Sequence, residues 1–153
     1  MNKDLFNRVK TTLLIPPQVE TGDTDVVNTT APVSVIGYES AMIEIHAGVL
    51  SDAGAIMSVK VWEGDASDGS DKAAVAAADL QIDPVLDAVP EATFQCAFDQ
   101  ADDSKVFKIG YLGSKKYLGL TISPVGNGGN VPVSASVVMS NPRHAPAGVT
   151  QAP

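Results

Sequence analysis

The stretch Lys105–Pro124 constrains the fold more than any other part of the chain, because it alternates apolar and polar residues on both sides of a turn. Two alternating runs, Val106–Leu112 and Tyr117–Ser123, flank Gly113-Ser114. A period of two residues is typical of strands with one buried face, and glycine and serine favour turns. The stretch therefore predicts a β-hairpin and a fold built from antiparallel strands.

Similar short runs recur along the chain and predict about eight strands in total. The 13 glycines and 10 prolines supply turns between them. Short strands without long helical periods favour an all-β antiparallel β-sandwich, either jelly-roll or immunoglobulin-like. Pro16-Pro17 is expected to end the first strand, since proline cannot donate to a strand ladder. The other expected strands are Thr11–Ile15, Val33–Ile36, Met42–Ala47, Ile56–Trp62, Thr93–Phe98 and Val131–Ser140.

A length of 153 residues suits a single domain. We expect an N-terminal arm over residues 1–12, a β-sandwich domain over 13–140 and a C-terminal strap or disordered tail over 141–153. Residues 63–90 read as a long irregular segment, in which Ala73–Ala78 is either a short helix or an apolar strap. The chain has neither an apolar run of membrane-spanning length nor a secretory signal, so we expect synthesis in a cytoplasm.

The formal net charge is −8, from 18 acidic and 10 basic residues. Nucleic-acid binding without sequence preference needs cations that neutralise phosphates, so this balance argues against it. The charge is also uneven, because residues 63–103 hold eleven acidic residues and one base, Lys72. That segment is either a solvated acidic loop or the outer surface of a molecule whose other, nearly neutral side docks on a partner.

Residues that could carry catalytic or metal chemistry do not fall into recognisable motifs. The loop Asp65–Asp71 lacks the ligand spacing of an EF-hand, and Gly126–Asn130 lacks the lysine of a phosphate-binding loop. Two histidines cannot form a three-histidine zinc site, and one cysteine excludes an intrachain disulfide. Cys96 alternates with Phe94 and Phe98, which predicts a small buried side chain. We therefore expect no enzyme, no cofactor and no metal site.

The single tryptophan, Trp62, falls on the strand face opposite Met57, Val59 and Val61. It either packs beneath the 63–90 segment or is an exposed anchor for a partner, since tryptophan is enriched at binding hot spots. A platform that stacks on sugars is a third possible use of this ring.

Four pieces between residues 59 and 146 form an ordered pattern, namely Val59–Ser70, Ile109–Ile122, Val131–Ala135 and Asn141–Pro146. Together they resemble small structural proteins of tailed-bacteriophage virions, of the capsid decoration (cement) type β-sandwich. The chain departs from that pattern at Trp62, where a polar residue is usual, and at Gly119, where arginine is usual. The loop before Asp68 is also longer than in the pattern.

The resemblance implies a protein that binds the outer surface of the assembled capsid and stabilises it. Its partner would be the major capsid protein, on which it would sit as a homo-oligomer, expected to be a trimer, with no direct contact to nucleic acid or membrane. It would be located at the capsid surface of the virion after synthesis in the host bacterial cytoplasm. The alternatives are a head-tail connector or tail component, and a carbohydrate-binding jelly-roll module. The candidate partner contacts are Lys3, Leu5, Phe6, Arg8, Lys10, Trp62, Arg143 and His144.

Overall fold

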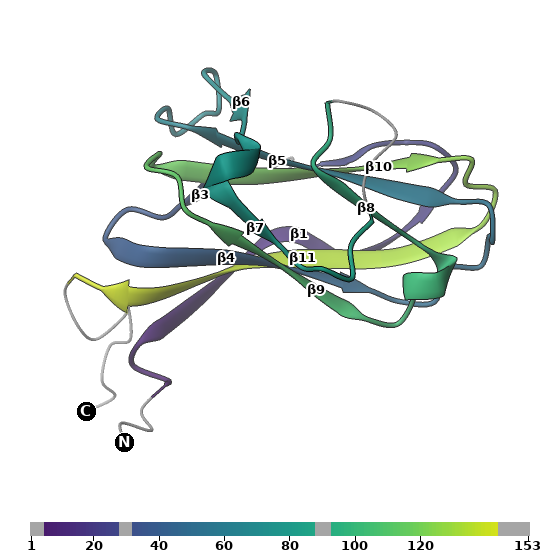
Figure 1. The fold of residues 1–153 in the computed structure, drawn as a ribbon, viewed down its shortest axis with the longest axis horizontal. Helices are drawn as coiled ribbons and strands as arrows, with labels where there is room; N and C mark the ends of the chain where they lie inside the picture. The colour runs from purple at the N-terminus through teal and green to yellow at the C-terminus, as the bar shows by residue number, and fades with distance from the viewer. Residues whose placement is uncertain (1–4, 28–31, 88–92, 144–153) are drawn as a thin grey trace.

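Two antiparallel β-sheets pack face to face and account for most of the residues that the structure describes (Figure 1). The computed structural model describes residues 5–27, 32–87 and 93–143. No helix within these ranges is long and apolar enough to cross a membrane. The elements are β1 (Val9–Thr21), β2 (Val26–Val27), β3 (Val33–Ser34), β4 (Tyr38–Ala47), β5 (Ile56–Gly64), β6 (Ala73–Ala74), the 3-10 helix η1 (Ala77–Asp79), β7 (Leu80–Ile82), β8 (Cys96–Asp99), the 3-10 helix η2 (Gln100–Asp102), β9 (Val106–Tyr111), β10 (Tyr117–Val125) and β11 (Asn130–Pro142).

The strand pairing is that of a jelly roll, which was one of the two expected topologies. The first sheet has the order β1-β11-β4-β9-β7, and the second has the order β2-β10-β5-β6, with β3 on β10 and β8 on β5. The first long strand therefore pairs with the last, β2 and β3 pair with β10, β4 with β9, and β5 with β8. Such nested pairs, rolled into two sheets, define the jelly roll. The all-β sandwich prediction is confirmed.

The prediction of a β-hairpin over Lys105–Pro124 is wrong, because the two strands belong to different sheets. Strand β9 pairs with β4 and β7, whereas β10 pairs with β5, β2 and β3. Residues 112–116 cross from one sheet to the other over the ring of Tyr111. A Cβ at Gly113 would lie 2.5 Å from that ring. The Tyr111 hydroxyl donates to Glu63 and accepts from the Lys115 N–H at 2.9 Å, which anchors the crossing.

Strand β1 begins earlier and runs further than the sequence predicts. It starts at Val9, so residues 9–12 belong to the sheet and not to an arm, and it continues through Pro16-Pro17 to Thr21. It is an edge strand paired only with β11, and the register shifts between Leu13 and Gln18. Prolines are tolerated on an edge because their missing N–H costs no ladder bond there. At the other terminus β11 extends to Pro142, two residues past the expected boundary.

The core follows the predicted alternation along the central strands. Ile43 and Ile45 of β4, and Met57, Val59 and Val61 of β5, are fully buried between the sheets. The rings of Phe98 and Phe107 meet there with centroids 5.0 Å apart. Cys96 is buried beside them as expected, and loss of hydration raises the pKa of its thiol to about 12.

The 63–90 segment is more ordered than the sequence predicts, and Ala73–Ala78 forms neither a regular helix nor a simple strap. It supplies a short edge strand to each sheet: β6 pairs with the end of β5, and β7 pairs with β9. The other half of β5 pairs with β8 along the same edge. The Gln95 side chain joins the two halves, accepting from the Val61 N–H at 2.9 Å and donating to the carbonyls of Val61 and Val75 at 3.1 and 3.2 Å.

Candidate functional site

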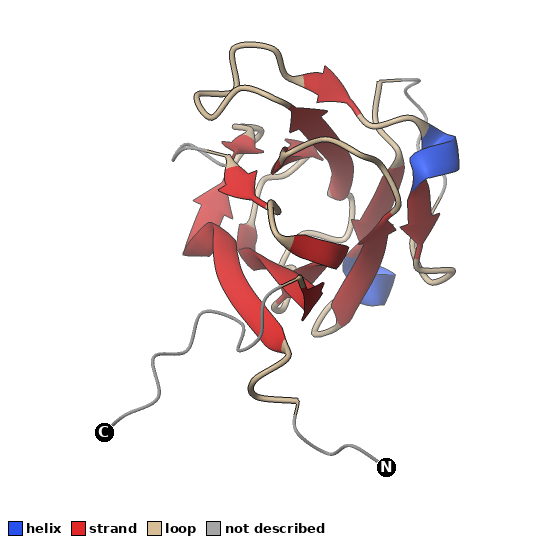
Figure 2. Ribbon diagram, turned by 90° about the vertical axis from the view of Figure 1, so that its left-hand side faces the viewer, coloured by secondary structure: helices blue, strands red, loops and turns tan. Residues whose placement is uncertain are grey.

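The start of β1 and the end of β11 lie side by side at one end of the sandwich, which Figure 2 views along the strands. We call this end the terminal pole; it comprises residues 5–10, 35–40, 63–72, 111–116 and Arg143. A turn precedes β1, in which the N–H groups of Arg8 and Val9 donate to the Leu5 carbonyl at 3.1 Å. The turn leaves Leu5 and Phe6 with 70% and 74% of their surface exposed. Two large apolar side chains thus face water next to the described chain ends.

A groove with a volume of about 630 Å³ opens at the terminal pole. One wall is the turn and first residues of β4 (35–41), the other is the crossing segment 111–116, and Arg143 completes it. Ile36 and Leu112 line it, and each has 57% of its surface exposed. Sequence reasoning missed this groove, because the hairpin prediction placed residues 112–116 within a single sheet.

The cations of the groove differ in whether the chain itself neutralises them. Lys115 contacts Asp65 at 2.7 Å, and this bond and the neighbouring negative charge raise the pKa of Lys115. Lys116 and Arg143 are exposed and have no carboxylate within 4.0 Å among the described residues. Glu39 is the one carboxylate in the lining of the groove. The groove is therefore net cationic in a chain whose total charge is −8.

The loop that holds Asp65 is stabilised by its own carboxylates. Asp71 accepts from the N–H groups of Asp65 and Ala66 at 2.8 and 3.1 Å, and Asp68 accepts from the Ser70 N–H at 3.0 Å. These bonds lower the pKa values of Asp71 and Asp68, because N–H donors favour the charged form. The carboxylates are thus turn-forming groups and do not converge on a common point.

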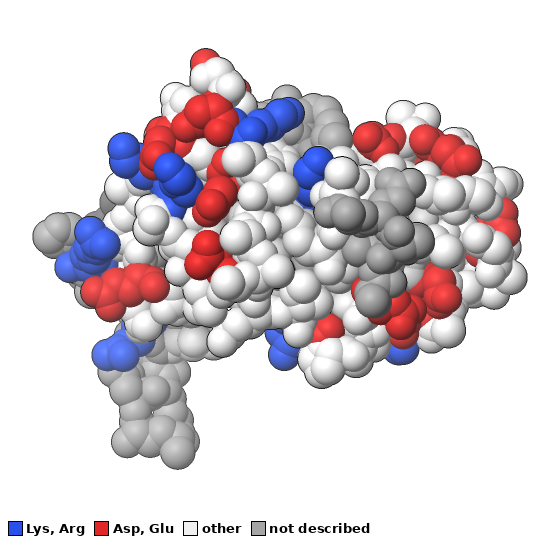
Figure 3. Space-filling model, turned by 45° about the horizontal axis from the view of Figure 1, so that its top comes forward, with Lys and Arg blue, Asp and Glu red and all other residues white. Residues whose placement is uncertain are grey.

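The opposite end of the sandwich is strongly acidic (Figure 3). The strand registers and loop contacts bring eight carboxylates and one cation, Lys105, to this end. Much of the acidic 63–103 segment lies elsewhere, since its first ten residues belong to the terminal pole. The structure therefore divides this segment between the two ends and does not form a single acidic face from it. The acidic pole comprises Glu20, Asp23, Asp25, Asp52, Asp87, Asp99, Asp102 and Asp103.

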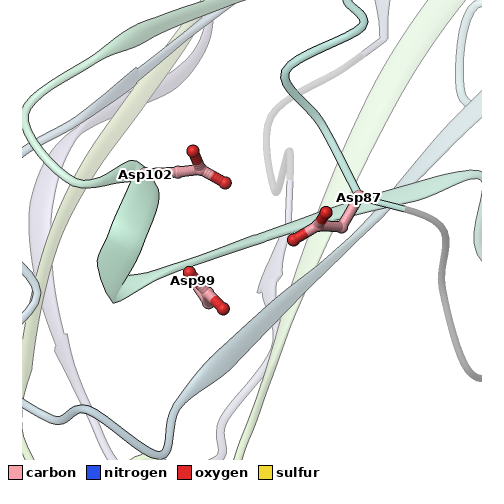
Figure 4. A group of neighbouring side chains, drawn as sticks. All are labelled: Asp87, Asp99 and Asp102. Carbon is pink, nitrogen blue, oxygen red and sulfur yellow. The ribbon is translucent and has the colours of Figure 1, made fainter.

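Three carboxylates of the acidic pole gather near η2 (Figure 4), with oxygens within 4.8 Å of one another: Asp87, Asp99 and Asp102. Two of them have partners in the chain. Asp99 accepts from the Ala101 N–H at 2.8 Å and so caps η2, and Asp102 contacts Lys105 at 2.8 Å. These two carboxylates stabilise η2 and the residues that follow it, through a helix cap and an ion pair. We therefore assign no metal to them.

Trp62 is buried beneath the 63–90 segment, with 7% of its surface exposed. This was one of its two expected placements, and the other, as an exposed contact for a partner, is wrong. Its ring lies across Gly119, its register partner on β10. Gly69 covers the ring from the loop, and the Lys72 ammonium lies 5.4 Å from its centroid. Two of the three departures from the virion pattern, Trp62 and Gly119, thus form one packing unit. A covered ring cannot stack on a sugar, so Trp62 does not support the carbohydrate-binding alternative.

The structure brings together part of the predicted contact set. Leu5, Phe6, Arg8, Lys10 and Arg143 are all exposed and lie at the terminal pole. Trp62 is not available, and Lys3 and His144 lie outside the described residues. Three groove-lining residues are further candidates outside the set chosen from the sequence, namely Ile36, Leu112 and Lys116.

No protein-family model and no curated protein matches this chain. Among solved structures, it aligns with the VP2 subviral particle of infectious bursal disease virus at 14% identity and a TM-score of 0.42, over 89% of this chain and 33% of VP2. It also aligns with D431N mutant VP2 from T=1 particles of that virus at 15% identity and a TM-score of 0.32, over 88% of this chain and 40% of VP2. The chain thus spans well under half of these capsid proteins, and the alignments assign it to no family.

Proposed function

We propose that this protein is a structural component of a phage virion that binds the outer surface of the assembled capsid and stabilises it, without enzymatic activity or a cofactor. The ordered resemblance over residues 59–146 supports this proposal. The observation that carries it is the asymmetry of the molecule. Unneutralised cations lie beside the exposed Leu5 and Phe6 at the terminal pole, whereas carboxylates dominate the opposite pole, which also exposes valines such as Val49 and Val106.

In this proposal the terminal pole faces the major capsid protein and the acidic pole faces solvent. Leu5 and Phe6 become buried on docking, which favours binding by about 25 cal/mol for each Å² of apolar surface removed from water. A protein that binds only the assembled shell stabilises that shell by mass action. A trimer would engage three terminal poles at once, so that avidity raises the retention of each copy.

The test is to mix the purified protein with empty expanded capsids and, separately, with unassembled capsid subunits, and to sediment both mixtures. We expect retention on capsids alone, with a copy number comparable to that of the capsid subunits. A copy number that fits one small ring would instead indicate a head-tail connector or tail component. No retention on capsids, or equal binding to free subunits, would contradict the proposal.

A matched pair of variants tests the orientation. Changing Leu5 and Phe6 to serine removes the exposed apolar pair of the terminal pole and is expected to weaken retention. Changing Val49 and Val106 to serine removes exposed apolar side chains near the acidic pole and is expected to leave retention intact. The reverse result would show that the acidic pole is the docking end.

A further inference from the structure

The first residues of β4 form an open strand edge inside the groove. The ladder between β4 and β9 begins only at Ala41 and Tyr111, because the Leu112 N–H donates to the Asp79 carbonyl at 2.8 Å and the chain then leaves the sheet. On its other side this part of β4 is paired with β11, with Tyr38 opposite Pro142 and Ser40 opposite Ser140. The groove thus occupies the place where β9 would have continued beside β4.

The direction of the backbone groups follows from the pairing with β11. The Arg143 N–H donates to the Gly37 carbonyl at 2.8 Å, so Gly37 directs this group toward β11. Backbone groups of successive residues in an antiparallel strand point alternately to the two neighbours. The carbonyl of Tyr38 therefore points into the groove. The backbone groups of Ser40 face β11 instead, because Ala41 pairs with Tyr111 and Ser40 with Ser140, and the ladder is irregular opposite Asn141, whose φ is 53°. An extended peptide laid in the groove can donate an N–H to the Tyr38 carbonyl.

The side chains around this edge suit an extended peptide of a particular composition. Ile36 and Leu112 offer exposed apolar surface on opposite walls. Lys116 and Arg143 offer two cations that no described carboxylate neutralises, and an arginine can bind a carboxylate through two parallel hydrogen bonds. The Tyr38 carbonyl offers one backbone contact, and these four side chains supply the remaining contacts and the selectivity.

We infer that this groove binds an extended segment of a partner protein that alternates apolar residues with carboxylates and donates a backbone N–H to the Tyr38 carbonyl. The identification of that partner as the capsid subunit rests on the proposed function. The chain's own tail does not meet the requirement, since residues 144–153 contain no aspartate or glutamate. The acidic pole of a second copy is also unsuited, because carboxylates such as Asp52 and Asp99 are held in turns by backbone N–H groups.

The test uses labelled peptides of alternating valine and glutamate, with peptides of alternating valine and lysine as the comparison, and fluorescence anisotropy of the full chain. We expect the acidic peptide to bind and to shift the amide NMR signals of Ser40 and Leu112. The double variant Lys116→Glu with Arg143→Glu is expected to lose at least about tenfold in affinity. The control variant, Lys60→Glu with Lys108→Glu, has the same net charge and is expected to bind as the unmodified chain does.

Three results would overturn the inference: equal binding of both peptides, equal affinity of the two double variants, or preferential binding of a peptide with the sequence of residues 144–153. An acidic peptide that is N-methylated at alternate residues cannot donate along one of its edges. Unchanged affinity for both such peptides, each methylated on a different edge, would exclude the bond to the Tyr38 carbonyl. Capsid sedimentation separates this inference from the proposed function. If the groove variant still sediments with capsids, the groove is not the docking site although the function stands. If the unmodified protein does not sediment with them, the function fails and the peptide result stands alone.

Discussion

The contact between Trp62 and Gly119 leads to the sharpest stability prediction, which concerns the substitution Gly119→Ala. A Cβ at Gly119 would lie 1.9 Å from Cζ2 and 2.0 Å from Cε2 of the indole, whereas ordinary contacts begin at 3.4 Å. The ring must therefore leave its position between β10 and the 65–72 loop. Burial of a tryptophan removes roughly 200 Å² from water, worth about 5 kcal/mol, and overpacking alone costs about 1–3 kcal/mol.

We expect Gly119→Ala to lower the free energy of unfolding by about 2–4 kcal/mol, since the displaced ring keeps part of its contacts. For a chain of this size each kcal/mol lowers the melting temperature by roughly 2–4 °C. Trp62→Ala is expected to cost about 3–5 kcal/mol by itself. In that background Gly119→Ala should cost less than about 1 kcal/mol, because the obstructing ring is gone.

The assay is urea unfolding followed by far-ultraviolet circular dichroism, which does not depend on the tryptophan. Gly110→Ala is the matched control, because a Cβ there meets chiefly the flexible side chain of Gln81, at 3.1 Å from its Oε1. The fluorescence maximum of Trp62 should move to longer wavelength in Gly119→Ala and stay unchanged in Gly110→Ala. The reasoning is refuted if Gly119→Ala costs no more than the control, or costs as much without the tryptophan as with it.

Three further predictions rest on described contacts. Gln95→Leu leaves the Val61 N–H on β5 without its partner and should cost about 1–3 kcal/mol, with faster hydrogen exchange at that amide; unchanged exchange would contradict the bridging role. The Cys96 thiol, whose pKa burial raises to about 12, should resist a disulfide reagent in the native protein at pH 8 and react on unfolding; rapid native reaction would show that it is accessible. Asp71 has a lowered pKa, so its stabilising contribution should be complete above its unfolded value of 3.8 and disappear as the pH falls through the folded pKa. Asp71→Asn should therefore reduce the fall in melting temperature at acid pH. An unchanged fall would exclude a stabilising role for the Asp71 carboxylate.

Local alternation was enough to predict the all-β class and the buried faces of the central strands. Ile43 and Ile45, like Met57 and Val59, lie in the core as their spacing indicates. Alternation cannot reveal which strands pair, because it carries no information on partners distant in sequence. The hairpin prediction failed for that reason, since residues 112–116 are as compatible with a crossing between sheets as with a turn within one.

The candidate site was predictable only in part. Exposed residues next to the chain ends, such as Phe6 and Arg143, could be chosen from the sequence because they lie outside the alternating runs. The burial of Trp62 could not be decided, because a loop from the same chain covers the polar face of β5. The two poles were also not predictable, because each is assembled from segments that are far apart in the sequence and that only the jelly-roll pairing brings together.

The position of β11 in the first sheet sets the order in which the molecule can be completed. This strand lies between β1 and β4 and is the only sheet neighbour of β1. During synthesis β1 therefore stays unpaired until residues 130–142 have been made. Pairing across nearly the whole chain is slow, because a long loop must close before the contact is gained. The terminal pole and its groove thus form only after residues 130–143 have been made, so shorter products lack the surface that we propose for docking.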